Sequence, residues 1–333
     1  MSRARAARRL ATAAAYGGGG LGLLGGSLYA VMKAQAAWAR RLIGNATIAP
    51  PVADGVYGAD LPGEPLRLLV AGDSSAAGYG LSDPWDTPPA LLASGLSHIA
   101  GRPVEVTSTA RVGAQSSHLD AQLERGLAGR PHVAVIVVGV NDVTHTVRPS
   151  ESVRLLEAAV RRVLDAGTQV VVGTCPDLGS IQPVAQPLRE LARRWSRRLA
   201  AAQTIATVEA GGRSVSLGAL LGPQFRLAPG ELFGPDRFHP SVAGYASMVA
   251  ALLPSVASAA GVWDEDDAED PTEPGGLVLP VSFAAAEAAV LDGTEVAAAR
   301  VGGRERGPRG RWAQLQHRVR RPVPPTVGRG SAR

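Results

Sequence analysis

The sequence predicts one α/β domain in which helices flank a parallel β-sheet. Between residues 66 and 260, short apolar runs alternate with longer segments whose apolar residues recur at helical spacing. The short runs contain few polar residues, which is typical of strands buried on both faces of a parallel sheet. Their alternation with helices favours right-handed crossovers, which place the helices on the faces of the sheet. A segment of roughly 200 residues is long enough to bury its own core.

Five apolar runs are expected to form the sheet, and helices are expected between and after them. The strands are predicted at residues 66–71, 104–108, 133–138, 169–173 and 204–208. The helices are predicted at residues 88–99, 116–127, 151–166, 187–202 and 241–253. Ligands of such sheets bind beyond the carboxyl ends of the strands, so polar residues that directly follow a strand are the candidates for a site.

A serine follows the first predicted strand, in the motif Gly72-Asp73-Ser74. At a strand-to-helix turn its hydroxyl would be exposed, and its own backbone N–H could point at an anion. Asn141 and Asp142 follow the third predicted strand, and the Asn141 amide could donate a hydrogen bond to an oxyanion. We expect Asp73 and Asp142 to brace their turns through hydrogen bonds to the backbone.

Asp236 and His239 lie three residues apart, just before the last predicted helix. This spacing lets the carboxylate and the imidazole meet while the imidazole faces Ser74. A serine hydroxyl is a poor nucleophile until a histidine takes its proton, and that histidine needs a carboxylate to hold its tautomer and stabilise its cation. Each motif alone is more often structural. All of them, in this order and at these ends of predicted elements, predict a serine hydrolase.

The chain resembles the SGNH, or GDSL-type, hydrolase family of esterases and lipases over residues 66–260. The resemblance implies that Ser74 is the nucleophile and that Asp236 and His239 complete the triad. It also implies an oxyanion hole formed by Ser74, Gly113 and Asn141, where Gly113 is the best match to a short glycine block. The implied fold is a three-layer α/β/α arrangement that resembles flavodoxin, and no cofactor is expected. The G-x-S-x-G motif of α/β-hydrolases is absent from the sequence.

The expected function is hydrolysis of a carboxylic ester, which could be a lipid, an acylated glycan or a small acyl ester, through an acyl-enzyme. An acyltransferase with the same triad is one alternative. An inactive binding or envelope scaffold protein is the alternative from another class. The remaining histidines show no metal-ligand spacing, so no metal site is expected.

The N-terminus predicts association with a membrane. Residues 1–9 form a basic leader with four arginines, and an uncharged run of 23 residues follows from Leu10 to Met32. That length is enough to cross a bilayer as a helix. Residues 10–36 are therefore predicted to be a membrane anchor, or a secretory signal cleaved near Ala34-Gln35-Ala36. Both alternatives place the domain outside the cytoplasm, whereas a cytosolic Gly/Ala-rich leader would not.

Two further segments are expected to be flexible. Residues 37–65 are rich in proline and glycine and are interpreted as a linker. Residues 261–333 begin with an acidic run, contain an alanine-rich helix candidate at 281–290, and end in a basic tail. Residues 300–333 hold ten arginines and one glutamate, although the whole chain carries only +5. The tail could bind an anionic surface, or it could only keep the chain soluble; specific nucleic-acid binding is not expected.

Overall fold

The protein was analysed as a computed structural model. It describes residues 26–44, 48–181, 183–218, 229–263, 277–289, 293–301, 304–305 and 312–317. The basic leader and most of the uncharged run from Leu10 to Met32 lie outside them.

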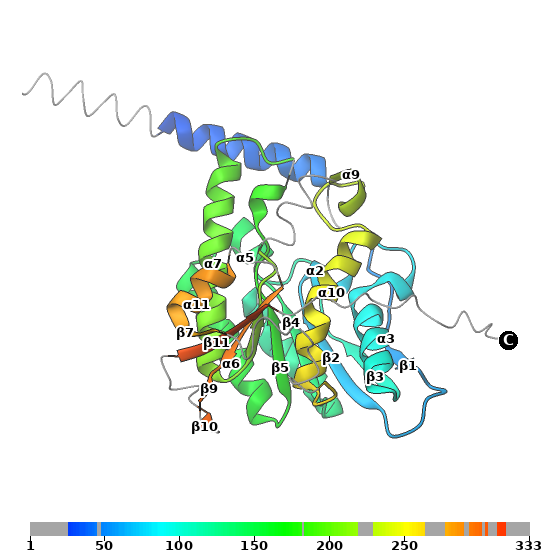
Figure 1. Cartoon of the computed structure of the whole chain (residues 1–333). Coiled ribbons are helices and arrows are strands. Elements are labelled where there is room, and N and C mark those ends of the chain that lie inside the picture. The colour runs from blue at the N-terminus through cyan, green and yellow to red at the C-terminus, as the bar shows by residue number, and fades with distance from the viewer. Residues whose placement is uncertain are drawn as a thin grey trace, which may run out of the picture.

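A mixed sheet forms the middle of the molecule, and its centre is parallel as predicted (Figure 1). The strands of this sheet follow the order β1-β3-β2-β4-β5-β6-β8-β11-β7, and β9 (Arg300–Val301) and β10 (Arg304–Glu305) pair separately. The parallel ones are β3 (Val104–Ser108), β2 (Leu66–Gly72), β4 (Val133–Val137), β5 (Gln169–Gly173) and β6 (Arg213–Val215). The antiparallel ones are β1 (Gly55–Tyr57), β8 (Thr294–Ala298), β11 (Trp312–His317) and β7 (Leu277–Pro280).

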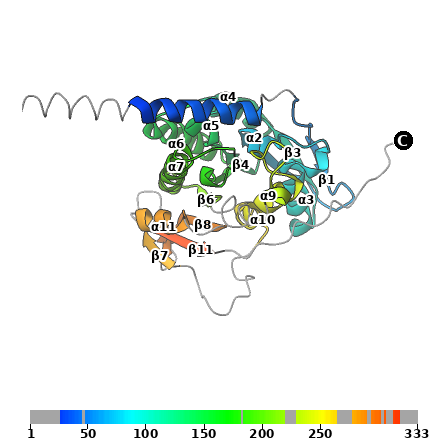
Figure 2. The ribbon, with the colours of Figure 1, turned by 90° about the horizontal axis from the view of Figure 1, so that it is seen from above.

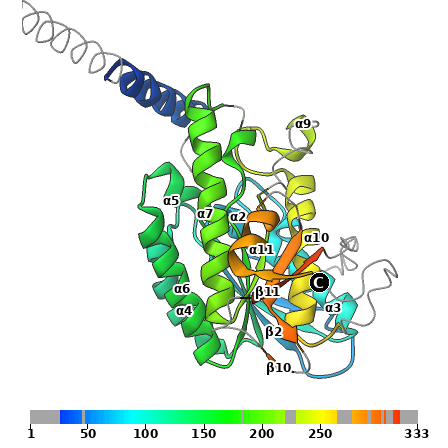
Figure 3. The same cartoon turned by 60° about the vertical axis from the view of Figure 1, so that its left-hand side comes forward.

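Helices cover both faces of the sheet, which gives the expected three layers. Leu68, Val70 and Val135 point to one face and pack with α3 (Pro88–Ala100) and α10 (Val242–Ala259). The residues next to them, Leu69 and Ile136, point to the other face. That face is covered by α4 (Leu119–Gly126), α6 (Pro149–Asp165) and α7 (Leu188–Ala210), as Figure 3 shows. The α/β/α prediction is therefore confirmed.

One predicted strand is wrong. Residues 204–208 lie in the last turns of α7, which ends at Ala210, and the strand of this region is β6. Gln203, Thr204 and Thr207 are buried at helical spacing, so the periodicity of this run belongs to a helix. Gly211 ends the helix in the left-handed conformation, with φ 100°.

The predicted linker is also partly ordered. A helix at residues 26–43 spans the end of the predicted anchor or signal segment (10–36) and the start of the linker (37–65). Within the linker, β1 pairs with β3. In Figures 1 and 2 the helix at 26–43 is the dark blue one, and it lies across the end of the molecule that holds the start of α7. The Gln35 side chain accepts a hydrogen bond from the Leu188 backbone N–H at 3.2 Å, which caps α7.

The C-terminal extension is not simply flexible, because its described residues complete the domain. β8 pairs with β6, and α11 (Val281–Ala288) packs beside α7 through Val281, Ala284 and Ala288. The helix candidate at 281–290 is thus confirmed. The acidic run and residues 318–333 of the basic tail lie outside the described residues.

One described helix, α10, is long and apolar enough to cross a membrane, but 61% of its apolar window is buried inside the domain. It is a core helix.

Candidate active site

A tight turn after β2 presents Ser74. Gly72 has φ 136°, and a Cβ built on it would lie 1.9 Å from the carbonyl oxygen of Val137, so only glycine fits there. Asp73 caps the short helix α2 (Ser74–Ala77), accepting a hydrogen bond from the Ser75 N–H at 2.9 Å. Ser74 is therefore fixed at the carboxyl end of β2, where the sequence predicted it.

A second turn carries the acid and the base. Asp236 Oδ1 accepts hydrogen bonds from the backbone N–H groups of Phe238 and His239, both at 3.0 Å. Gly234 N–H donates to the His239 carbonyl at 2.8 Å, and Arg237 takes the left-handed conformation with φ 55°. These contacts fold the six residues 234–239 and Pro240 back on themselves just before α10.

The three side chains form one hydrogen-bonded chain. Asp236 Oδ2 lies 2.6 Å from His239 Nδ1, and His239 Nε2 lies 3.1 Å from Ser74 Oγ. Burial alone would raise the pKa of Asp236, but the hydrogen bonds from His239 and from the two backbone N–H groups hold the pKa below its ordinary value. Asp236 is therefore a carboxylate, which can hold the Nδ1 proton and stabilise an imidazolium.

Aromatic rings enclose the imidazole. The ring centroids of Tyr79 and Phe238 lie 4.5 Å and 4.8 Å from that of His239. The buried Tyr245 hydroxyl donates to the Tyr79 carbonyl at 2.9 Å and lies 3.4 Å from the Ser74 carbonyl. Tyr245 thus joins α10 to the turn that carries Ser74.

Gly113 and Asn141 lie in the two loops that flank this chain. Gly113 is exposed, with φ 78° in a turn where Ala114 N–H donates to the Arg111 carbonyl at 3.0 Å. Arg111 N–H in turn donates to the Gly72 carbonyl at 3.0 Å. Asn141 is the second residue of α5 (Val140–Thr144), which directly follows β4. Within the described residues its side-chain amide makes no hydrogen bond and remains available to a ligand.

Three buried polar side chains, Gln122, Gln203 and Asp142, support these segments, and no local pattern marks Gln122 or Gln203 for that role. The Gln122 amide pairs with both backbone groups of Gly72, accepting at 2.7 Å and donating at 2.9 Å. Gln203 donates to the Val138 carbonyl at 2.9 Å and accepts from Cys175 N–H at 2.8 Å, which joins the ends of β4 and β5. The Asp142 carboxylate was predicted to brace its own turn through backbone hydrogen bonds. It accepts one from its own backbone N–H, and it also bonds to the N–H and hydroxyl of Ser116 in the Gly113 loop.

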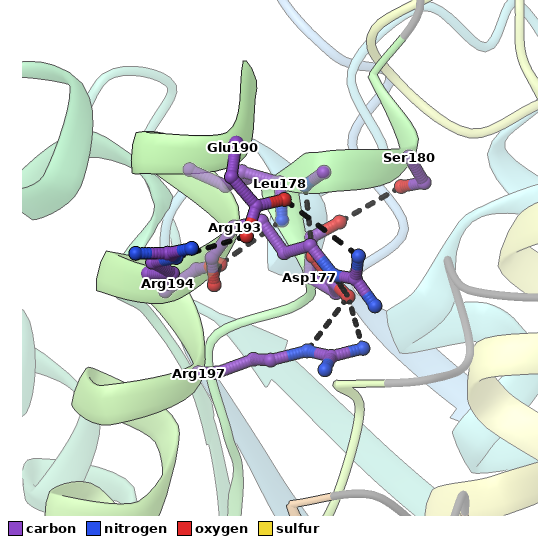
Figure 4. Close-up of polar contacts among 9 residues, drawn as sticks. Asp177, Leu178, Ser180, Glu190, Arg193, Arg194 and Arg197 are labelled. Atoms are coloured by element: carbon purple, nitrogen blue, oxygen red, sulfur yellow. Dashed lines mark hydrogen bonds and ion pairs between the residues drawn. The ribbon is translucent and has the colours of Figure 1, made fainter. Parts of the chain in front are cut away.

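A separate charged cluster fixes the start of α7 beside β5 (Figure 4). Asp177 is buried after β5, and its Oδ2 pairs with Arg197 at 2.9 Å and with Arg193 at 3.7 Å. Glu190 pairs with Arg194 at 2.9 Å. Asp177 and Glu190 each pair with an arginine of α7. We therefore interpret the cluster as a structural contact that holds the start of α7.

No group of His, Cys, Asp or Glu within the described part of the chain could hold a metal ion. Some of the other histidines have structural partners: His118 Nδ1 accepts from Gln115 N–H at 3.0 Å, and His132 Nδ1 accepts from Arg67 N–H at 2.9 Å.

Comparison with known proteins identifies the family. Residues 70–247 match the GDSL-like lipase/acylhydrolase family. The chain belongs to this family. It is 40% identical over 257 residues to the GDSL-like esterase Rv1075c of Mycobacterium tuberculosis, covering 73% of this chain and 80% of that protein. Membership confirms the resemblance drawn from the motifs and the expected class, a serine hydrolase that acts on ester bonds.

Solved structures are more distant from this GDSL-like hydrolase. A catalytic mutant of Axe2, an acetylxylan esterase from Geobacillus stearothermophilus, has a TM-score of 0.48 and 20% identity, covering 59% of this chain and 95% of that one. TesA has a TM-score of 0.44 and 21% identity, covering 58% and 99%. Because the identities and TM-scores are this low, these structures do not indicate the substrate of the present chain.

Proposed function

We propose that this GDSL-like hydrolase is an esterase or lipase in which Ser74, His239 and Asp236 act as a catalytic triad. The observation that carries the proposal is the continuous hydrogen-bonded chain from Asp236 Oδ2 through both ring nitrogens of His239 to Ser74 Oγ. Nucleophile, base and orienting acid each lie within hydrogen-bond reach of the next group, as acyl transfer requires.

In the proposed reaction, His239 Nε2 takes the proton from Ser74 Oγ as that oxygen attacks the ester carbonyl carbon. The tetrahedral oxyanion collapses and expels the alcohol oxygen, which takes the proton from His239. A water molecule then gives one proton to His239 and attacks the acyl-enzyme. The acid leaves, and the proton returns to Ser74 Oγ. Asp236 remains ionised throughout and stabilises the imidazolium in both halves.

The oxyanion is proposed to accept hydrogen bonds from the backbone N–H groups of Ser74 and Gly113 and from the Asn141 amide. The free amide of Asn141 and the left-handed, exposed Gly113 support this assignment. Losing one oxyanion donor costs about 2.7–4 kcal/mol in the barrier. Asn141→Ala should therefore lower kcat by roughly a hundredfold or more while the protein remains folded.

The proposed substrate is a carboxylic ester: a lipid, an acylated glycan or a small acyl ester. Transfer of the acyl group to an alcohol instead of water is the second candidate, since the same triad performs both reactions. Product analysis with and without an added alcohol separates them. An inactive scaffold is disfavoured by the intact hydrogen-bonded chain.

The test is hydrolysis of a p-nitrophenyl ester series of increasing acyl length by the full chain, together with Ser74→Ala and a fluorophosphonate probe. We expect Ser74-dependent turnover, a label on Ser74 found by mass spectrometry, and loss of both in the variant. A folded wild-type protein that shows neither turnover nor label would refute the proposal and favour the scaffold.

We further propose that the protein is held at a membrane, or exported, with the hydrolase domain outside the cytoplasm. The helix at 26–43 supports the membrane alternative. Its docked stripe is Met32, Gln35, Ala36, Ala39 and Ile43. Its free surface carries Trp38 and Leu42, which are 60% and 54% exposed, and such aromatic and aliphatic residues suit a lipid interface. Fractionation and protease protection of the full chain in cells test this; a soluble, protease-protected protein would contradict it.

The basic tail is proposed as a second contact, with an anionic surface. Deleting residues 318–333, which removes five arginines and leaves β11 in place, should weaken binding to anionic liposomes at low salt and make no difference at high salt, because the Debye length falls to about 3 Å at 1 M. Equal binding of both forms at low salt would remove the tail from this role.

A further inference from the structure

One buried carboxylate joins the loop that holds Gly113 to the short helix α5, which holds Asn141. Asp142 follows Asn141 in α5 and is almost wholly buried. Both of its carboxylate oxygens lie 3.2 Å from Ser116 N, and Oδ2 lies 3.2 Å from Ser116 Oγ. Ser116 begins the short 3-10 helix Ser116–His118, three residues after Gly113.

This contact closes the second end of the Gly113 loop. At its first end, Arg111 N–H donates to the Gly72 carbonyl, two residues before Ser74. At its second end, Ser116 is tied to the residue after Asn141. Gly113 lies between these ties at an exposed position, where an added Cβ would meet no atom within 4 Å. The position of the Gly113 N–H relative to Asn141 therefore depends on the bond between Asp142 and Ser116.

A third buried side chain, Ser152, supports the contact between Asp142 and Ser116. Ser116 Oγ lies 3.0 Å from Ser152 Oγ, and Ser152 is fully buried in the first turns of α6. The three side chains thus connect α5, the Gly113 loop and α6 without access to solvent. Burial raises the pKa of the Asp142 carboxyl, although hydrogen bonds from Ser116 and Ser152 oppose this. Burying a carboxyl group costs free energy, so its use here indicates that the position of the Gly113 loop is important.

We propose that Asp142 is a positioning residue that holds the Gly113 loop against Asn141, so that both donors reach the same oxyanion. The role rests on the proposed function, because it assumes that these two groups form the oxyanion hole. Donors must lie within about 2.7–3.1 Å of the oxyanion, and a misplacement of about 1 Å can cost a hundredfold in rate. Asp142 touches no reacting atom.

The first test compares the kinetics of four full-length variants and one control variant on the best p-nitrophenyl ester. Asp142→Ala should lower kcat by roughly a hundredfold with KM changed by less than about threefold, because only transition-state contacts are lost. Ser116→Ala keeps the backbone N–H bond and should lose less, about tenfold. Asp142→Asn serves if the alanine variant does not fold. Ser152→Ala, behind the tie, should lose least.

Thr168→Ala is the matched control. Thr168 is buried, and its hydroxyl donates to the Pro131 carbonyl at 2.8 Å at the opposite end of the sheet, before β5. Its loss should lower the melting temperature but leave kcat unchanged. If Asp142 only stabilised the fold, the Asp142 variants would behave like this control.

A double-mutant cycle tests whether Asp142 acts through the oxyanion donors. In an Asn141→Ala background, removing Asp142 should cost about tenfold or less, since one of the donors that it positions is already absent. Fully multiplicative losses, or a folded Asp142 variant with kcat within threefold of the wild type, would overturn the proposal.

Hydrogen exchange separates this proposal from the function on which it rests. The backbone amides of residues 111–116 should exchange faster in Asp142→Ala than in the wild type, and those around Thr168 should not. Unchanged exchange would refute the tie even in an active enzyme. Faster exchange in a protein without Ser74-dependent turnover would refute the proposed function but leave the tie intact.

Discussion

Replacing Asp73 with asparagine should change how the stability of this protein depends on pH. Asp73 is fully buried beside Ser74, and among the described residues its Oδ2 has no hydrogen-bond partner. Burial raises its pKa from 3.8 to about 6, although the hydrogen bonds from Ser75 and the nearby His239 oppose the increase. The folded protein therefore binds this proton more tightly than the unfolded chain does.

The size of the effect follows from the shift. One pKa unit corresponds to 1.36 kcal/mol, so a shift of about two units gives about 3 kcal/mol. Because the folded-state pKa is the higher one, the contribution of Asp73 to stability is fully present below pH ~4 and is lost as pH rises through about 6. Relative to Asp73→Asn, the wild type should thus lose about 3 kcal/mol between pH 4 and pH 7.

Urea unfolding of both proteins at half-unit pH steps measures this difference, and taking the difference cancels the other titrating groups. A constant offset from the amide itself does not matter, since only the slope is tested. Asp60→Asn, at an exposed position, controls for the loss of one carboxyl group. Parallel curves for the wild type and Asp73→Asn across this range would refute the reasoning.

Three further substitutions test the supporting structure. Glu295→Ala removes a buried ion pair with Arg213 at 2.7 Å and a hydrogen bond from Ser255. It should lower the free energy of unfolding in urea by about 3 kcal/mol, and Glu295→Gln should lower it less. A Glu295→Ala protein as stable as the wild type would contradict this. Tyr245→Phe removes the bond to the Tyr79 carbonyl and should cost about 1–2 kcal/mol with kcat changed less than tenfold; a larger fall in kcat would place Tyr245 in the chemistry. Gly72→Ala should yield no soluble, folded protein, and normal expression with normal activity would show that the turn can move.

Local sequence signals predicted most of the core and the reacting groups. The strands at 104–108 and 169–173 agree with β3 and β5 at both ends, because short apolar runs bounded by turn residues are unambiguous there. Ser74, Asp236 and His239 come together because their motifs follow strands or precede a helix at one edge of the sheet. The strand predicted at residues 204–208 was wrong. The β-propensity of these residues also fits a strand, but in the structure they continue the buried face of α7.

The groups that support the site could not be predicted in the same way. Gln122 meets Gly72 across 50 residues, and Asp142 meets Ser116 across 26. Each contact depends on which loops the finished fold brings together, and neither Gln122 nor Ser116 carries a local mark of that role. The pairing of β8 with β6 has the same character, since it joins segments about eighty residues apart across the acidic run.

The added strands have a structural reason that is separate from catalysis. Without β8, the three-residue strand β6 would be the exposed edge of the sheet, and its unpaired N–H and C=O groups would be open to other chains. β8 pairs with this edge, and Glu295 fixes it there through Arg213 and Ser255. β5 and β6 separate the addition from β4 and β2, whose carboxyl ends carry Asn141 and Ser74. The extension therefore covers the edge of β6 without adjoining β4 or β2.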